Sequence, residues 1–144
     1  MVVVAAVDRS DRAPKVAREA QEIANAFDES LHVLHVLSQS TFVELERTSV
    51  HKTGTAVDPE RIRDHARTIA TEATADLEGT IEHVGLVGSA ADEVVRYADE
   101  HDARFVVLGP RKRSPAGKAL FGSVAQSVML EADCSVVAVS TAEE

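Results

Sequence analysis

The chain has 144 residues, of which 44% are hydrophobic and 27% charged, and its formal net charge is −9. A chain of this length buries roughly 70% of its unfolded surface, so it folds without a metal or a disulfide, and we expect one domain over residues 1–144. The acidic balance, the absence of Trp and the single Tyr argue against nucleic acid as a partner, because such proteins usually combine a basic face with aromatic stacking residues.

The charge pattern and the apolar runs also bear on the cellular compartment. The first apolar run, residues 2–7, is too short for a signal peptide and has no basic leader. No apolar stretch approaches the ~18 residues of a membrane span, so we expect a cytoplasmic protein with no membrane partner. Lys is scarce relative to Arg while Asp and Glu are abundant, which favours a salt-adapted, halophilic source over an ordinary acidic protein.

The first third of the chain predicts a buried strand followed by a helix. Residues 2–7 form a continuous apolar run, which is typical of a strand buried on both faces of a parallel sheet. From residue 13 to residue 27 apolar side chains recur every three or four positions, which predicts an amphipathic helix. Ser10 or Asp11 is the expected cap of this helix, and Pro14 lies in its first turn.

The middle of the chain predicts a second strand and a second long helix. The strand covers residues 31–37, and the polar residues 38–57 after it form the longest loop. Asp58 is the expected cap of the helix, with Pro59 at its first position and Gly79 at its end.

The last part of the chain continues the alternation of strands and helices. This order predicts right-handed crossovers and a parallel sheet with helices on both faces. The predicted elements are an edge strand over residues 80–87, a helix through residues 91–98, a strand over 105–108, a glycine-bearing loop over 109–122, a helix over 123–131 and a fifth strand over 135–139.

The loop from Gly109 to Gly122 is the strongest candidate for a ligand site. It follows a buried strand, and ligands of open α/β sheets bind at the carboxyl ends of the strands. Gly122 and Ser123 begin a helix whose N-terminus attracts anions. Ser123 and Gln126 also fit a capping box, which requires no ligand. Neither a Walker A loop nor a Rossmann glycine fingerprint is present.

Other kinds of site have little support in the sequence. His32 and His35 lie on one predicted strand and point to opposite faces, so they are not a metal pair. The sequence contains no HExxH, CxxC or Gly-x-Ser-x-Gly motif. We therefore predict no metal site and no catalytic residue.

Several motifs in the correct order resemble the universal stress protein family. The family signature is Gly, two residues, Gly, nine residues, Gly and then Ser or Thr; Gly109 and Gly122-Ser123 match it, and Lys112 replaces the second glycine. Three further segments match in part: Asp8 with Arg9 in place of the family's glycine, the second-strand motif at residues 34–36, and Gly88 with Ala90 in place of the family's proline.

The resemblance covers nearly the whole chain and implies both a fold and a ligand. The fold is α/β, a five-stranded parallel sheet in the order 3-2-1-4-5 with helices on both faces, similar to the adenine nucleotide alpha hydrolases. The ligand is ATP or AMP, with Mg²⁺ as an optional companion. The implied contacts are adenine with Ala6, Asp8 and Val36, ribose with Asp8 and Gly88, and phosphates with Gly109, Arg111, Lys112, Gly122, Ser123 and Val124. Without a ligand, Asp8 would cap the first helix and the basic residues 111–113 would face solvent.

The leading hypothesis is a nucleotide-binding regulatory protein of the stress response, which acts through binding and hydrolyses ATP slowly or not at all. The fifth strand, residues 135–139, is apolar and has no Lys or Pro to protect its edge, so we expect a homodimer through this strand. The protein partner is unknown. The first alternative is an interaction module of the same fold that binds no nucleotide; an adenylyl-transferring or ATP-cleaving enzyme ranks last.

Overall fold

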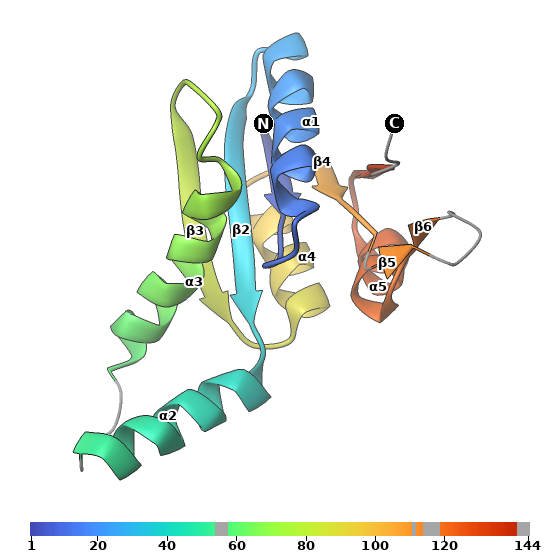
Figure 1. Ribbon diagram of the computed structural model, residues 1–144. Coiled ribbons are helices and arrows are strands. Elements are labelled where there is room, and N and C mark those ends of the chain that lie inside the picture. Colours follow the sequence, from blue (N-terminus) through green and yellow to red (C-terminus); the bar gives the residue numbers. More distant parts are fainter. Residues whose placement is uncertain (54–57, 111, 114–118, 141–144) are drawn as a thin grey trace.

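The computed structural model describes residues 1–53, 58–110, 112–113 and 119–140, with the backbone alone at residues 49–53, 112, 113 and 119. Strands and helices alternate along the chain, and the sheet lies between two layers of helices (Figure 1). In chain order the elements are β1 (Val2–Ala6), α1 (Ala13–Ala26), β2 (Ser30–Leu37), α2 (Gln39–Thr53), α3 (Pro59–Ala73), β3 (Ile81–Val87), α4 (Ala90–Glu100), β4 (Ala103–Leu108), β5 (Lys112–Arg113), β6 (Ala119–Leu120), α5 (Ser123–Glu131) and β7 (Ser135–Ala138).

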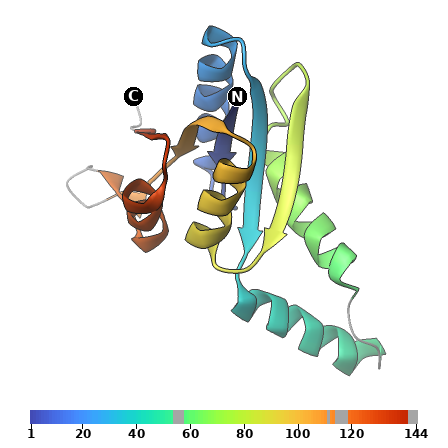
Figure 2. The same cartoon turned by 180° about the vertical axis from the view of Figure 1, so that it is seen from behind.

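The main sheet has five parallel strands in the order β3-β2-β1-β4-β7, which confirms the predicted order and direction. Helices α1 and α3 cover one face, and α4 and α5 cover the other, as Figure 2 shows from behind. The first strand of the chain is therefore central: Val3 pairs with Leu31 of β2 on one side and with Phe105 of β4 on the other. The edge strands are β3 and β7.

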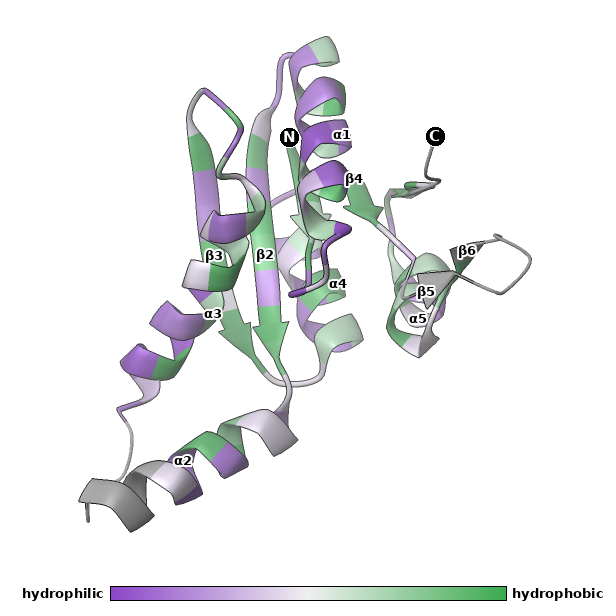
Figure 3. Cartoon of the chain, in the orientation of Figure 1, coloured by the Kyte–Doolittle hydropathy of each residue, from purple (hydrophilic) through white to green (hydrophobic). Residues whose placement is uncertain are grey.

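The continuous apolar runs follow from burial on both faces of the sheet. Val3 and Ala5 pack in the cluster under α1, while Val4 between them packs with Leu34 and Val106 in the cluster under α4. Val3, Val4 and Ala5 are all fully buried. Because successive strand residues point to opposite faces, a strand covered on both sides shows no regular polar alternation. In Figure 3 green segments predominate along β2, interrupted by paler and purple ones.

Helix α2 corrects the prediction that residues 38–57 form a loop. Ser38 Oγ accepts the backbone N–H of Thr41 at 3.2 Å and so caps the helix. Phe42 and Leu45 then pack against the small cluster that contains Ile62 of α3. The helix projects beyond the end of the sheet (Figure 1), and tertiary contact rather than a strong apolar stripe holds it.

Helix α3 confirms one predicted cap, whereas α1 corrects another. Asp58 accepts the backbone N–H of Glu60 at 3.0 Å, and Pro59 is the first helical residue, as the sequence predicts. Helix α1 begins at Ala13, with Arg12 rather than Ser10 or Asp11 at the cap position and no side-chain cap bond. Neither Ser10 nor Asp11 caps it, because Ser10 is engaged in the turn before the helix.

The predicted bounds of α5 are confirmed, whereas its capping box and the predicted end of α3 are wrong. Gly122 occupies the cap position of α5 and Ser123 is its first residue, so the expected capping box does not form. Gln126 Nε2 instead donates to Phe121 O at 2.9 Å. Helix α3 ends at Ala73, and the predicted terminator Gly79 lies after the following turn with a φ of +101°.

The glycine-bearing loop carries a small antiparallel hairpin, β5–β6, that the sequence did not predict; Lys112 pairs with Leu120. Among the described non-glycine residues, positive φ values occur only at Asp28 and Asp102. Arg9 and Lys112, which replace family glycines, therefore stand in ordinary backbone conformations, and neither position requires a glycine for φ.

Within the described ranges, every helix is too short or too polar to traverse a lipid bilayer.

Candidate functional site

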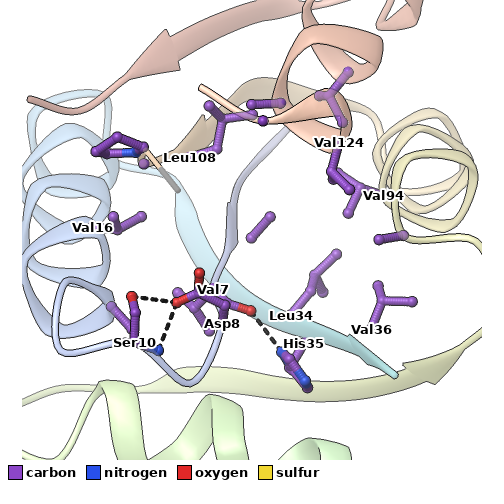
Figure 4. A pocket seen from close by; sticks show the side chains of 18 of the residues that line it. Val7, Asp8, Ser10, Val16, Leu34, His35, Val36, Val94, Leu108 and Val124 are labelled. Atoms are coloured by element: carbon purple, nitrogen blue, oxygen red, sulfur yellow. Dashed lines mark hydrogen bonds between the residues drawn. The ribbon is translucent and has the colours of Figure 1, made fainter. Parts of the chain in front are cut away.

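A cavity of about 290 Å³ opens at the carboxyl ends of β1, β2 and β4, between α1 and α4 (Figure 4). This is the place where parallel α/β sheets bind ligands. Two loops border the cavity: the first loop, residues 8–12 after β1, and the second loop, residues 109–122 after β4. The described lining residues come from the strand ends (Ala6, Val7, Leu34, His35, Val36, Leu108), the first loop and helix α1 (Asp8, Ser10, Arg12, Ala13, Val16), helix α4 (Ala90, Val94), and the second loop with helix α5 (Gly109, Pro110, Gly122, Ser123, Val124, Ala125, Val128).

The inner wall of the cavity is apolar and polar groups lie along its rim. Leu34 and Val128 are fully buried at the inner wall, and Val94 is nearly so. At the rim, Ser10 donates from its backbone N and its Oγ to Asp8 Oδ1, at 2.9 and 2.6 Å. The carboxylate is thus held in place by its own turn, as the dashed lines in Figure 4 show. An apolar wall with a few oriented polar groups is typical of a small-molecule site.

His35 joins β2 to the end of β1 beside this rim. Its Nδ1–H donates to Val7 O at 2.7 Å, so the neutral ring carries its lone pair on Nε2. Burial lowers the pKa of His35 below its ordinary value of 6.5, and nearby Arg9 and His65 lower it further, against the opposing effect of the Val7 bond. Arg9 itself contacts His65 of α3, with Nη2 and Nε2 3.2 Å apart.

Arg12 connects the two loops that border the cavity. Its Nε donates to Pro110 O at 3.1 Å, and its side chain is 26% exposed. Helix α5 also begins at the cavity, with no side-chain cap and no acidic residue in its first turn. A guanidinium and a helix N-terminus both favour an anion.

Glycine is required for close packing at Gly109, where the second loop leaves β4. A Cβ at this position would lie 2.6 Å from Cγ2 of Val16, so only a residue without a side chain fits against α1. Gly88 has a φ of +146° at the end of β3, and its N–H donates to Leu37 O at 2.9 Å. Gly88 is needed for the turn there.

The structure brings seven of the ten predicted site residues to the cavity: Ala6, Asp8, Val36, Gly109, Gly122, Ser123 and Val124. Gly88, the predicted ribose neighbour, is not among the lining residues. Arg111 lies outside the described residues, as does the side chain of Lys112. The sequence interpretation missed Ser10, Arg12 and His35 as lining residues. The spacing of Asp8, Ser10 and Arg12, every second residue in one turn, was the signal that could have found them.

These groups suit binding of a flat apolar molecule that carries hydroxyls and an anion. The inner wall accepts an apolar ring, Asp8 can accept from hydroxyls, and Arg12 with the start of α5 can hold a negative charge. Among the residues that the structure describes, no three His, Cys, Asp or Glu side chains are grouped to hold a metal ion.

The model of the universal stress protein family matches residues 1–140 of this chain. The chain belongs to the universal stress protein family. It is also 33% identical over 133 residues to Universal stress protein G of Shigella flexneri, with 87% of both chains covered.

Two solved structures of universal stress proteins are similar to this universal stress protein and contain nucleotides. One, a complex with cAMP, is 26% identical with a TM-score of 0.62, and the match covers 99% of this chain and 98% of that one. The other, from Archaeoglobus fulgidus in complex with dAMP, is 29% identical with a TM-score of 0.53 and 96% of both chains covered.

Proposed function

We propose that this universal stress protein binds an adenine nucleotide, AMP or ATP, in the cavity at the carboxyl ends of β1, β2 and β4. The observation that carries the proposal is the combination of the apolar inner wall, the oriented Asp8 carboxylate and the positive rim at Arg12 and α5. Two similar universal stress proteins hold cAMP and dAMP. Adenine would lie against Ala6 and Val36, the ribose hydroxyls at Asp8, and the phosphates between Gly109 and Ser123.

The proposed role is regulation of the stress response through binding rather than catalysis. His35 is the one histidine among the described lining residues, and its Nδ1 is committed to Val7 O. Burial lowers the pKa of His35, which makes its ring a weaker general base. The nucleotide would instead order the second loop and so change a surface that a protein partner recognises.

The decisive experiment identifies what the purified protein carries and what it binds. We expect denatured protein to release an adenine nucleotide, and calorimetry of ligand-free protein to show AMP and ATP binding, with and without Mg²⁺ to test whether the ion contributes. GMP is the matched control for the base. Absence of both release and binding would instead favour the interaction module of the same fold, to which the replacement of the second signature glycine by Lys112 also points.

We also propose a homodimer through the edge strand β7. This strand has four residues, SVVA, with no Lys or Pro to protect its free edge. The adjacent helix α5 leaves Leu130 86% exposed and Met129 40% exposed. Leu130→Glu should convert the dimer to a monomer in light scattering at micromolar concentration, whereas Val43→Glu on the exposed side of α2 should not. A monomeric parent protein would contradict the proposal.

The net charge of −9 supports a further proposal, that the protein is adapted to high salt. Like charges on a compact acidic protein repel one another, and salt screens them. We expect the melting temperature to rise steadily from low to molar KCl. An unchanged melting temperature over that range would remove the proposal and leave the fold and the nucleotide site unaffected.

A further inference from the structure

Ser10 makes three hydrogen bonds within the first loop, and two of them end on the same atom. Its backbone N and its Oγ donate to Asp8 Oδ1 at 2.9 and 2.6 Å, and the Oγ accepts the backbone N–H of Arg12 at 3.3 Å. Because a serine hydroxyl has a single proton, the bond to Asp8 uses it. Ser10 is half-buried and lines the cavity. It therefore fixes the orientation of the Asp8 carboxylate at the cavity rim.

The two bonds from Ser10 occupy one carboxylate oxygen of Asp8 and leave the other free. A carboxylate oxygen has two lone pairs, and both lone pairs of Oδ1 accept from Ser10. Among the residues that the structure describes, none is bonded to Asp8 Oδ2. In Figure 4 this second oxygen points away from Ser10 and into the cavity. A ligand thus meets a single fixed oxygen that can accept two hydrogen bonds.

The free oxygen of Asp8 selects the kind of donor that a ligand can offer. A carboxylate repels a phosphate and accepts from O–H and N–H groups. Two cis hydroxyls on neighbouring carbons lie close enough for both to donate to one oxygen. The two N–H bonds of an amino group diverge and cannot both reach the same oxygen. The group that matches Asp8 Oδ2 is therefore a cis-diol, and in a nucleotide this group is the 2′,3′-diol of the ribose.

The bonds from Ser10 also determine how much this contact contributes to affinity. A side chain that is free to rotate loses rotamer freedom when a ligand orders it, and that loss opposes binding. Asp8 is exposed at the rim, so without the Ser10 hydroxyl only one backbone N–H would hold its carboxylate. With both bonds present, the carboxylate is oriented before the ligand arrives.

We propose that Ser10 is a positioning residue that presents Asp8 Oδ2 to the ribose, and that the site therefore prefers nucleotides with an intact 2′,3′-diol. The inference rests on the proposed nucleotide function and adds to it the specificity for the sugar. A 2′-deoxynucleotide keeps one hydroxyl and still binds, but more weakly than the ribonucleotide.

The test measures binding of AMP, 2′-deoxy-AMP and 2′,3′-dideoxy-AMP by calorimetry, after thermal melts confirm that each variant is folded. For the parent protein we expect affinity to fall about fivefold with each hydroxyl removed, as for the loss of one hydrogen bond. Ser10→Ala should weaken AMP binding about fivefold and change dideoxy-AMP binding less than about twofold, because the dideoxy ligand makes no bond to Asp8. Ser10→Thr keeps the hydroxyl and should restore AMP binding to within about twofold of the parent.

The matched control is Ser38→Ala. It removes a serine hydroxyl that likewise accepts a backbone N–H, that of Thr41 at 3.2 Å, but lies outside the described cavity lining. This variant should keep the parent's affinities for all three ligands.

Three results would overturn the proposal while the nucleotide function stands. Equal parent affinities for AMP and 2′-deoxy-AMP would remove the preference for the diol. An equal loss of AMP and dideoxy-AMP binding in Ser10→Ala would show that Ser10 only maintains the loop, and unchanged AMP binding in Ser10→Ala would show that Asp8 needs no positioning. If the parent protein binds none of the three ligands, the nucleotide function itself fails, and the proposal for Ser10 fails with it.

Discussion

The two loops that border the cavity keep their shape by different means. The first loop is held by side-chain hydrogen bonds: Ser10 Oγ donates to Asp8 Oδ1 and accepts the backbone N–H of Arg12. At the two described ends of the second loop the small size of glycine matters: a Cβ does not fit at Gly109, and Gly122 holds the cap position of α5 without a side-chain cap bond.

This difference explains which substitutions each loop tolerates. In the second loop the limit is the space available for a side chain. Position 109 therefore requires glycine, whereas position 112, occupied by Lys112 in the extended strand β5, does not. In the first loop the constraint is hydrogen bonding, so Arg9 can replace a family glycine while Asp8 and Ser10 keep their bonds. A glycine signature alone therefore describes only one of the two loops.

The largest effect is expected from filling the space at Gly109. In Gly109→Ala the new Cβ would overlap Cγ2 of Val16, and we expect the free energy of unfolding to fall by about 1–3 kcal/mol. Urea denaturation measures this cost. In a Val16→Ala background Cγ2 is gone, so the same substitution should cost clearly less. An equal cost in both backgrounds would mean that space is not the constraint on the second loop.

Removal of a hydrogen-bonding side chain from the first loop should weaken ligand binding. Asp8→Ala removes the acceptor of both Ser10 bonds and the proposed acceptor of the ribose hydroxyls. We expect affinity for both AMP and adenosine to fall about fivefold, since one such bond contributes ~1 kcal/mol. Ser127→Ala, on α5 outside the cavity lining, is the control. Loss of AMP binding alone would assign Asp8 to the phosphate instead of the ribose.

The sequence predicted the sheet well because its central strand, β1, is buried on both faces. A run such as residues 2–7 has no polar alternation, and only a sheet covered on both faces removes that alternation. The order of the strands came from the family resemblance, and five apolar runs alone would not give it. Helix α2 was missed because Phe42 and Leu45 find their partners on α3, a contact that no local pattern reveals.

The site was predicted only in part, because some of its residues leave a local pattern in the sequence and others do not. The second loop can be identified from the spacing of its glycines, because the backbone at its two ends requires small residues and the sequence shows them directly. Arg12 was missed because an arginine after a strand usually faces solvent, and only the fold brings Pro110 to its side chain. Ser123 was expected to cap α5, but the helix begins one residue earlier than a serine cap requires.

A smaller effect is expected in the pH dependence of the free energy of unfolding. Burial lowers the pKa of His35, His32 and His83 below 6.5 in the folded protein, so the unfolded chain binds more protons as pH falls below that value. The free energy of unfolding should therefore decrease from about pH 6.5 downward and level off below the folded pKa values. In His35→Asn the amide can still donate to Val7, and the pH dependence should be shallower. An unchanged profile would remove His35 as a cause.

The smallest effect is expected at Lys112. Lys112→Gly restores the family signature, but the backbone there is an extended strand paired with Leu120, so no strain is relieved. We expect a loss of at most about 1 kcal/mol in the free energy of unfolding, from the greater freedom of glycine in the unfolded chain. We also expect Lys112→Ala to weaken ATP binding more than AMP binding. A more stable Lys112→Gly protein would mean that the position needs glycine after all.

The central place of β1 has a consequence for synthesis on the ribosome. Val3 pairs with Phe105 of β4, which is synthesised about 100 residues later. At ~5–20 residues per second, the time between the synthesis of these two residues is roughly 5–20 s. During this time β1 and β2 can pair, but the other edge of β1 stays open and the apolar face that α5 will cover stays exposed. During synthesis the chain therefore exposes an unpaired edge of β1 and an apolar sheet face, both of which favour aggregation. A chaperone would protect the chain most at this stage.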